Sequence, residues 1–125
     1  MITEDYVSFE TAKLLKEKGF NEPTTKSYYT EGFENPMIFS HDLLPCIQTD
    51  EFLCPTLQMA MKWLMKVHNI FVTITMYLKE GIELFHYELL EPYDNHIDTL
   101  YSEDGLRTYE EACEAAIKYC LENLI

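Results

Sequence analysis

Four cysteines and four histidines are the side chains of this sequence that could bind a metal ion or act as a nucleophile and its base. Seven residues separate Cys46 from Cys54, and six separate Cys113 from Cys120. Structural zinc sites space paired cysteines about two to four residues apart, which neither pair matches. We therefore predict no metal site. We expect these cysteines to pack as small apolar side chains, with Cys113 and Cys120 on the buried stripe of one helix.

The segment His41-Asp42, with Cys46 nearby, holds a nucleophile, a base and a carboxylate. Residues this close in sequence rarely face one another productively, and a catalytic cysteine needs its base within hydrogen-bond reach. The chain has four glycines and lacks the glycine-rich loops that bind phosphates and dinucleotides. We predict no catalytic residue and no cofactor. The alternative is a small enzyme or ligand-binding protein with its site near these three residues.

The other three histidines have simpler interpretations. His68 is expected at the C-terminal end of a helix, where its charge would interact favourably with the helix dipole. His86 is expected on the polar side of a β-hairpin beside Thr75, where it can belong to an exposed binding surface. His96 is expected in a loop.

Acidic residues dominate the charge, because 22 Asp and Glu against nine Lys and Arg give a net charge of −13. Residues 79–125 alone hold 12 acidic and three basic residues. Such a chain repels nucleic acid and anionic lipid, so we expect neither as a direct partner. We expect a protein partner or self-association. The candidate partner-binding acidic face consists of Glu83, Glu88, Glu91, Asp94, Asp98, Glu110 and Glu114.

Two interpretations of this acidic face stay open. It can imitate a phosphate backbone and thereby bind a DNA- or RNA-handling protein. It can also be a solvated surface that keeps a small protein from aggregating, which is the commoner role of an acidic surface.

The elements that must position these residues follow from capping residues and periodicity. Ser8 can cap a helix over residues 9–18 that ends before Gly19, and Thr108 with Glu111 forms a capping box for the last helix. Strands are expected at residues 26–30, 37–40, 70–78 and 82–90. Residues 41–54 are expected to form a loop with at most a short strand, and residues 91–107 a polar connection.

Residues 55–78 are the centre of the predicted core, because they contain no Asp or Glu and hold the single tryptophan, Trp63. Pro55 fits the first turn of a helix. The polar side of this helix is one narrow strip formed by Gln58, Lys62, Lys66 and Asn69. So wide an apolar surface needs cover on two sides, from the sheet and from either the irregular segment 21–55 or a second subunit.

A two-residue turn at Glu80-Gly81 would join residues 70–78 and 82–90 into a hairpin. The expected pairs are Met76 with Phe85, Ile74 with Tyr87, Val72 with Leu89, Thr75 with His86 and Thr73 with Glu88. This register makes one face apolar and the other polar, whereas a shift by one residue would mix the two faces.

These elements follow one another in the order α-β-β-α-β-β-α. We predict an α+β fold with a single domain over residues 1–125, an antiparallel sheet of about four strands, and helices packed mainly on one face. The N-terminal MITEDYVSFE lacks the positive and apolar regions of a secretion signal, and no apolar run is long enough for a membrane span. We expect a cytoplasmic protein with reduced thiols.

Three blocks carry a resemblance to a known family. They are VSFETAKLLKEKGF at residues 7–20, PTLQMAMKWLMKVHNI at 55–70 and YEEACEAAIKYCLENLI at 109–125, somewhat over a third of the chain. They resemble a family of small uncharacterised proteins encoded by phages and prophages of gut bacteria. The resemblance implies the cytoplasm of an infected or lysogenic bacterium. It implies no activity and no catalytic or binding residue.

Overall fold

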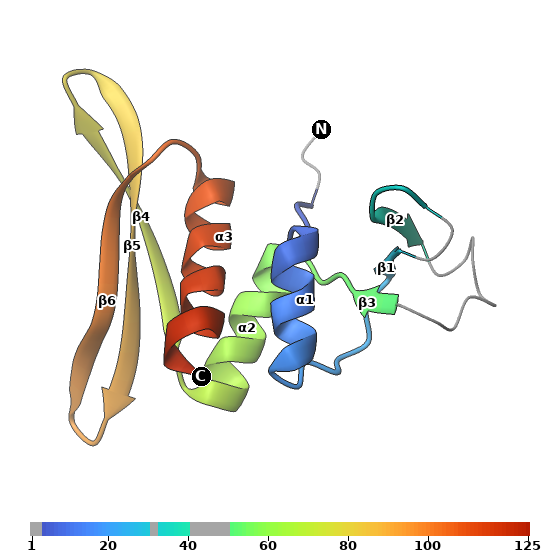
Figure 1. Cartoon of the computed structure of the whole chain (residues 1–125). Helices are drawn as coiled ribbons and strands as arrows, with labels where there is room; N and C mark the ends of the chain where they lie inside the picture. Colours follow the sequence, from blue (N-terminus) through green and yellow to red (C-terminus); the bar gives the residue numbers. More distant parts are fainter. Residues whose placement is uncertain (1–3, 31–32, 41–50) are drawn as a thin grey trace. The chain divides into compact units, whose positions relative to one another are not determined.

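The computed structural model describes residues 4–30, 33–40 and 51–125. Contacts divide the chain into two compact units, Met1–Thr56 and Leu57–Ile125. Each unit contains a three-stranded antiparallel sheet and at least one helix among these residues (Figure 1). The expectation of one domain over residues 1–125 stays a prediction.

The first unit consists of helix α1 (Phe9–Glu17) and strands β1 (Lys26–Tyr29), β2 (Met37–Ser40) and β3 (Glu51–Leu53). β1 is the middle strand and pairs antiparallel with β2 and with β3. α1 contacts β3. The two strands predicted in this part of the chain are confirmed. β3 is the short strand that the sequence allowed within residues 41–54.

Helix α1 begins and ends at the predicted capping residues. The Ser8 hydroxyl accepts a hydrogen bond from the Thr11 N–H, 3.3 Å away. At the other end Gly19 has a φ of +90°, and the Phe20 N–H donates to the Leu15 carbonyl at 2.9 Å. A positive φ is inexpensive for glycine, and this pattern of bonds is the Schellman motif. The helix therefore starts where predicted and ends one residue earlier, at Glu17.

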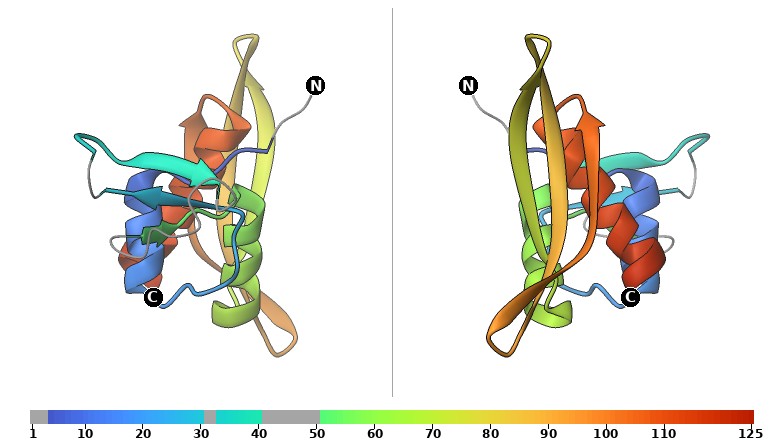
Figure 2. Two further views of the ribbon diagram at one scale, coloured as in Figure 1. Left: turned by 90° about the vertical axis from the view of Figure 1, so that its right-hand side faces the viewer. Right: turned by 90° about the vertical axis from the view of Figure 1, so that its left-hand side faces the viewer.

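The second unit contains helix α2 (Leu57–His68), strands β4 (Phe71–Lys79), β5 (Ile82–Tyr93) and β6 (His96–Leu106), helix α3 (Tyr109–Tyr119) and the π-helical turn η1 (Cys120–Leu124). The strand order is β4-β5-β6. α2 contacts α3 and β4, and α3 contacts all three strands. Both helices of this unit lie on the same face of its sheet (Figure 1). We call the other face, seen from the front in the right-hand view of Figure 2, the open face.

The predicted register of the β4–β5 hairpin is confirmed. Each of the five expected pairs is observed, from Val72 with Leu89 to Met76 with Phe85. The turn residues Glu80 and Gly81 have φ values of 54° and 78°. Positive φ at both central residues gives the turn a twist that matches the flanking strands. The apolar face of this hairpin is the one that the helices cover.

The core of the second unit forms between α3 and the helix-covered face of the sheet. Tyr87 and Leu89 on β5 are buried, as are Ala116 and Ile117 on α3. The Thr108 hydroxyl accepts from the Glu111 N–H at 3.0 Å, which confirms the predicted N-cap of α3. The Glu111 carboxylate accepts from the Arg107 N–H at 3.2 Å, one residue before the N-cap, whereas the predicted capping box would use the N–H of Thr108 itself. Local capping and long-range packing thus orient α3 together.

The α+β class and the order of the predicted elements are confirmed, but the sheet differs from the prediction. Two sheets of three strands are present instead of one sheet of about four. The additional strand β6 lies where a polar connection was expected. Pairing between β5 and β6 is irregular between Phe85 and Tyr87 and again between Leu89 and Leu90. Bulges of this kind interrupt the alternation of polar and apolar residues that identifies a strand from its sequence.

Candidate functional site

A charged cluster around His86 occupies the middle of the open face. His86 lies on β5, opposite Thr75 of β4, as predicted. Its Nδ1 atom is 2.6 Å from Oδ1 of Asp104 on β6, and its Nε2 atom is 3.1 Å from Oε1 of Glu88. The contact with Asp104 joins β5 to β6, and the contact with Glu88 lies within β5.

A bulge in β6 makes this cluster possible. Phe85 pairs with Leu106 and Tyr87 pairs with Glu103, so two residues of β6, Asp104 and Gly105, lie opposite His86. Gly105 has a φ of +81°, which favours glycine. Bulges redirect side chains. This one directs the Asp104 carboxylate to the imidazole ring.

The carboxylates determine the protonation of His86. Hydrogen bonds from its ring to Asp104 and then to Glu88 raise the pKa of His86 above its ordinary value of 6.5, against a smaller opposite effect of burial. Both ring nitrogens can donate to carboxylates only in the imidazolium form. Such a histidine has no free nitrogen to act as a general base, and with one positive and two negative charges the cluster keeps a net negative charge.

A shallow depression lies beside His86 and Asp104. Thr75, Tyr77, His86 and Asp104 line it, and its volume is about 230 Å³. The Tyr77 hydroxyl accepts a hydrogen bond from the Gly105 N–H at 3.0 Å, which joins the two edge strands across β5. The Asp104 side chain is 73% exposed, so its carboxylate is available to a partner.

An apolar hollow lies at one end of the same face. Phe71, Thr73, Leu90, Pro92 and Ile97 line a space of about 200 Å³. Ile97 is 65% exposed, an unusual exposure for an isoleucine side chain. The open face therefore presents carboxylates at its centre and an exposed apolar surface at one end.

The seven predicted acidic residues do not all lie on this face. Glu88 does, since it pairs with Thr73 and Ser102. Glu83 and Glu91 occupy alternate positions of β5, which by strand geometry point to the opposite side. Asp98 pairs with Glu91, and Asp94 lies in the β5–β6 turn with a φ of 52°. Glu110 and Glu114 lie on α3.

The open face also holds two features that the sequence interpretation missed. Asp104 was assigned to a loop and left out of the acidic face, and the apolar hollow depends on β6 and on the extension of β5 beyond Leu90. The sequence contains a signal for β6, the strand on which both features depend. Two residues, Asp94 and Asn95, separate Tyr93 from His96, and such a pair between apolar or aromatic residues is typical of a tight hairpin turn.

The described cysteines are buried, and the two other described histidines lie at the end of α2 and at the start of β6. Cys113 and Cys120 are fully buried, which confirms the predicted packing, and burial raises the pKa of the Cys120 thiol to about 12. Cys54 is buried too, with its sulfur 3.7 Å from the Val7 carbonyl oxygen. His68 does end α2, and its ring packs edge-on against Trp63. His96 begins β6 instead of lying in a loop.

The alternative site at His41, Asp42 and Cys46 lies outside the described residues. Within those residues, no group of three His, Cys, Asp or Glu side chains could hold a metal ion. The His86 cluster agrees with this, because its two carboxylates lie at opposite nitrogens of one ring. No helix in residues 4–30, 33–40 and 51–125 is long and apolar enough to cross a membrane.

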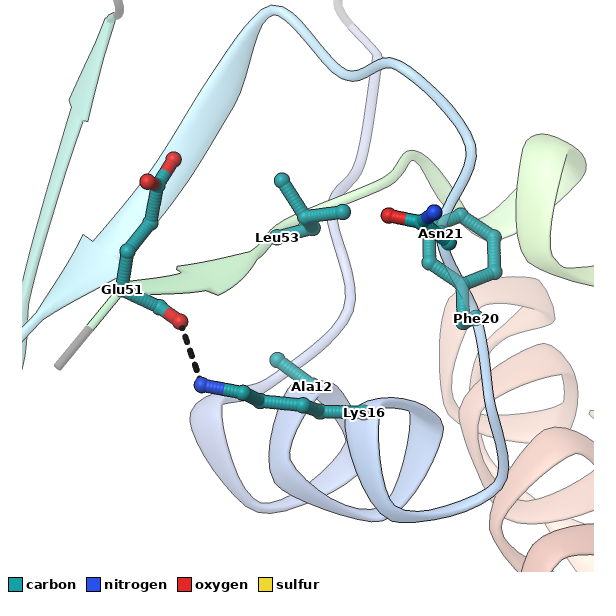
Figure 3. A pocket seen from close by; sticks show the side chains of 6 residues that line it. All are labelled: Ala12, Lys16, Phe20, Asn21, Glu51 and Leu53. Carbon is teal, nitrogen blue, oxygen red and sulfur yellow. Dashed lines mark hydrogen bonds between the residues drawn. The ribbon is translucent and has the colours of Figure 1, made fainter. Parts of the chain in front are cut away.

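The first unit has a pocket of about 260 Å³ between α1 and β3 (Figure 3). Ala12, Lys16, Phe20, Asn21, Glu51 and Leu53 line it. The Lys16 ammonium donates to the Glu51 carbonyl at 3.0 Å and lies 4.6 Å from the centre of the Phe52 ring. The Glu51 carboxylate accepts from the Ser27 hydroxyl at 2.6 Å. The Lys16 bond holds α1 to β3, and the Ser27 bond joins β1 to β3.

Comparison with protein-family models, with curated proteins and with solved structures gave no match to this chain. The function proposed below therefore depends on the residues and the geometry of the open face.

Proposed function

We propose that this protein is a phage- or prophage-encoded accessory protein that acts by protein–protein contact in the bacterial cytoplasm. The contact surface is the open face of β4, β5 and β6. The observation that carries the proposal is that the Glu88 and Asp104 carboxylates lie on the same face as the exposed apolar hollow around Ile97.

The chemistry of this face selects a basic partner. Its carboxylates attract Lys and Arg side chains, while the hollow accepts an apolar side chain next to them. Proteins that handle DNA or RNA present such basic surfaces, because they bind phosphates. The protein would then occupy the site of a nucleic-acid backbone. The net charge of −13 would speed the encounter with a basic partner at low salt.

Affinity capture tests this proposal. The tagged protein is incubated with lysate of a gut bacterium, the retained proteins are released by steps of increasing salt, and each step is identified by mass spectrometry. We expect a DNA- or RNA-handling protein that elutes at raised salt, because salt screens contacts between opposite charges. If the wild-type chain retains no such protein, the proposal is wrong.

Two matched variants locate the contact. Glu88→Gln and Asp104→Asn together remove two negative charges from the open face. Glu17→Gln and Glu22→Gln remove two exposed acids of the first unit. Circular dichroism first confirms that both variants fold. We expect the first variant to lose the partner and the second to keep it. Equal retention by both would show that the open face is not the contact surface.

A further inference from the structure

The edge of the second sheet at β4 is unprotected. β4 pairs with β5 on one side and with no other strand among the described residues. Its nine residues include no Pro, Gly, Asp or Glu, and its one charge is at its end, Lys79. Proteins usually protect long edge strands with charges, prolines or bulges, because unpaired backbone N–H and C=O groups readily pair with another strand.

The opposite edge of the same sheet provides the contrast. β6 carries Asp98, Glu103 and Asp104, and its pairing with β5 is interrupted by two irregularities. Two copies that met through β6 would bring these acids together, and like charges across a strand pair are destabilising. One edge is thus protected against association and the other is left available.

Apolar side chains beside the β4 edge remain exposed. Met76 and Leu78 on β4 are 49% and 66% exposed, although their strand positions belong to the helix-covered face. Val67 on α2, which contacts β4, is 58% exposed. Part of the apolar surface of α2, which the sequence predicts to be covered on two sides, is therefore exposed.

Charge favours a second copy at this edge. Residues 55–79 contain three lysines and no acid, in a chain of net charge −13. Two such chains repel each other over most of their surfaces, and the repulsion is least where acids are absent. The sequence of β4 is also compatible with itself. Reflected about Thr75, it places Ile74 opposite Met76 and Val72 opposite Leu78, and it brings no like charges together.

We propose that β4 pairs antiparallel with β4 of a second copy about Thr75, which joins two three-stranded sheets into one continuous sheet. The pairs across the interface are Ile74 with the partner's Met76, Val72 with the partner's Leu78, Thr73 with the partner's Tyr77, and Phe71 with the partner's Lys79. The last pair allows a cation–π contact. The interface is isologous, as in most homodimers.

Substitutions at the symmetry axis test this pairing. Thr75 is exposed, and in the dimer it faces its own copy. Thr75→Glu places two carboxylates across the axis and Thr75→Lys places two ammonium groups there. Either change should weaken the dimer at least about tenfold. An equal mixture of the two variants should restore a mixed dimer, because each carboxylate then meets an ammonium group. Thr99→Glu, at an exposed position of the other edge strand, is the matched control and should leave the dimer intact.

The measurement is the molar mass by light scattering across a wide range of protein concentrations. We expect the wild-type chain to reach twice its mass of 14.8 kDa. A strict monomer would overturn the proposal, even if a foreign extended peptide bound the edge. Loss of the dimer in Thr99→Glu as severe as in Thr75→Glu would overturn it too. So would a mixture of the Glu and Lys variants that stays monomeric while the wild type dimerises.

This inference is independent of the proposed function, and salt separates the two. Pairing through β4 should strengthen as salt screens the repulsion between two acidic chains, whereas binding of a basic partner at the open face should weaken.

Discussion

The Nδ1 atom of His86 on β5 lies 2.6 Å from Oδ1 of Asp104 on β6, at the bulge that places Asp104 and Gly105 opposite one residue of β5. This bond is the largest cause of the raised pKa of His86, and the bond to Glu88 is the second. A group whose pKa rises on folding binds its proton more tightly in the folded state. The cluster therefore stabilises the fold fully below the ordinary pKa of 6.5, and the stabilisation is lost as pH rises through the raised pKa.

Replacement of Asp104 by Asn should lower the pKa of His86, measured by NMR titration of the imidazole protons. Glu88→Gln should lower it by less, because the Asp104 bond is the larger cause. Asp104→Asn should also reduce the free energy of unfolding by about 0.2–1 kcal/mol near pH 6, since surface ion pairs contribute on that order. The loss should be smaller above the raised pKa of His86. Equal losses at both pH values would contradict the role of the charged ring.

A substitution in the turn between β4 and β5 should increase the stability of the fold. Glu80 has a φ of 54°, a conformation that Asn tolerates better than Glu. Glu80→Asn should increase the free energy of unfolding by about 0.5–1 kcal/mol, followed by urea unfolding with Trp63 fluorescence. Glu83→Asn is the matched control, because it removes the same charge from a strand position without positive φ. If both variants gain the same unfolding free energy, the effect comes from the removed charge and not from the turn.

Substitutions at Leu89 and Ile97 distinguish a residue that stabilises the fold from a residue that contacts a partner. Leu89 is fully buried beneath the helices, so Leu89→Ala should cost about 2–5 kcal/mol of unfolding free energy. Ile97 is exposed on the open face, and Ile97→Ala should change stability by about 0.5 kcal/mol or less while weakening capture of a partner. Urea unfolding and affinity capture measure the two effects. A large stability loss in Ile97→Ala would show that this side chain belongs to the core.

Cys54, Cys113 and Cys120 should resist thiol reagents in the folded protein. All three are fully buried, and burial raises the pKa of Cys120 to about 12, which leaves almost no reactive thiolate near neutral pH. Brief treatment with iodoacetamide followed by peptide mass spectrometry should find these residues unmodified, and modified in concentrated urea. Rapid labelling of Cys120 without urea would contradict the described packing of η1.

Much of the second unit could be predicted because its determinants are local. The Thr108 N-cap uses residues three positions apart, and the β4–β5 register follows from a two-residue turn and strict alternation. In the first unit the N-cap and the glycine C-terminus of α1 follow in the same way. The candidate site was predicted less completely. His86, Thr75 and Glu88 were placed correctly on one face, but Asp104 was not connected to them.

The sequence by itself determined the helices, their caps, the central hairpin and the acidic charge, since each depends on neighbours along the chain or on composition. Only the tertiary structure decided that β6 pairs with β5, that Asp104 reaches His86, and that β4 remains an edge. The physical reason is the same in all three cases. Strand pairing and bulges are set by backbone bonds between distant residues, and a bulge removes the alternation by which an edge strand is recognised. The tertiary structure also decided which acidic residues lie on which face of the second sheet.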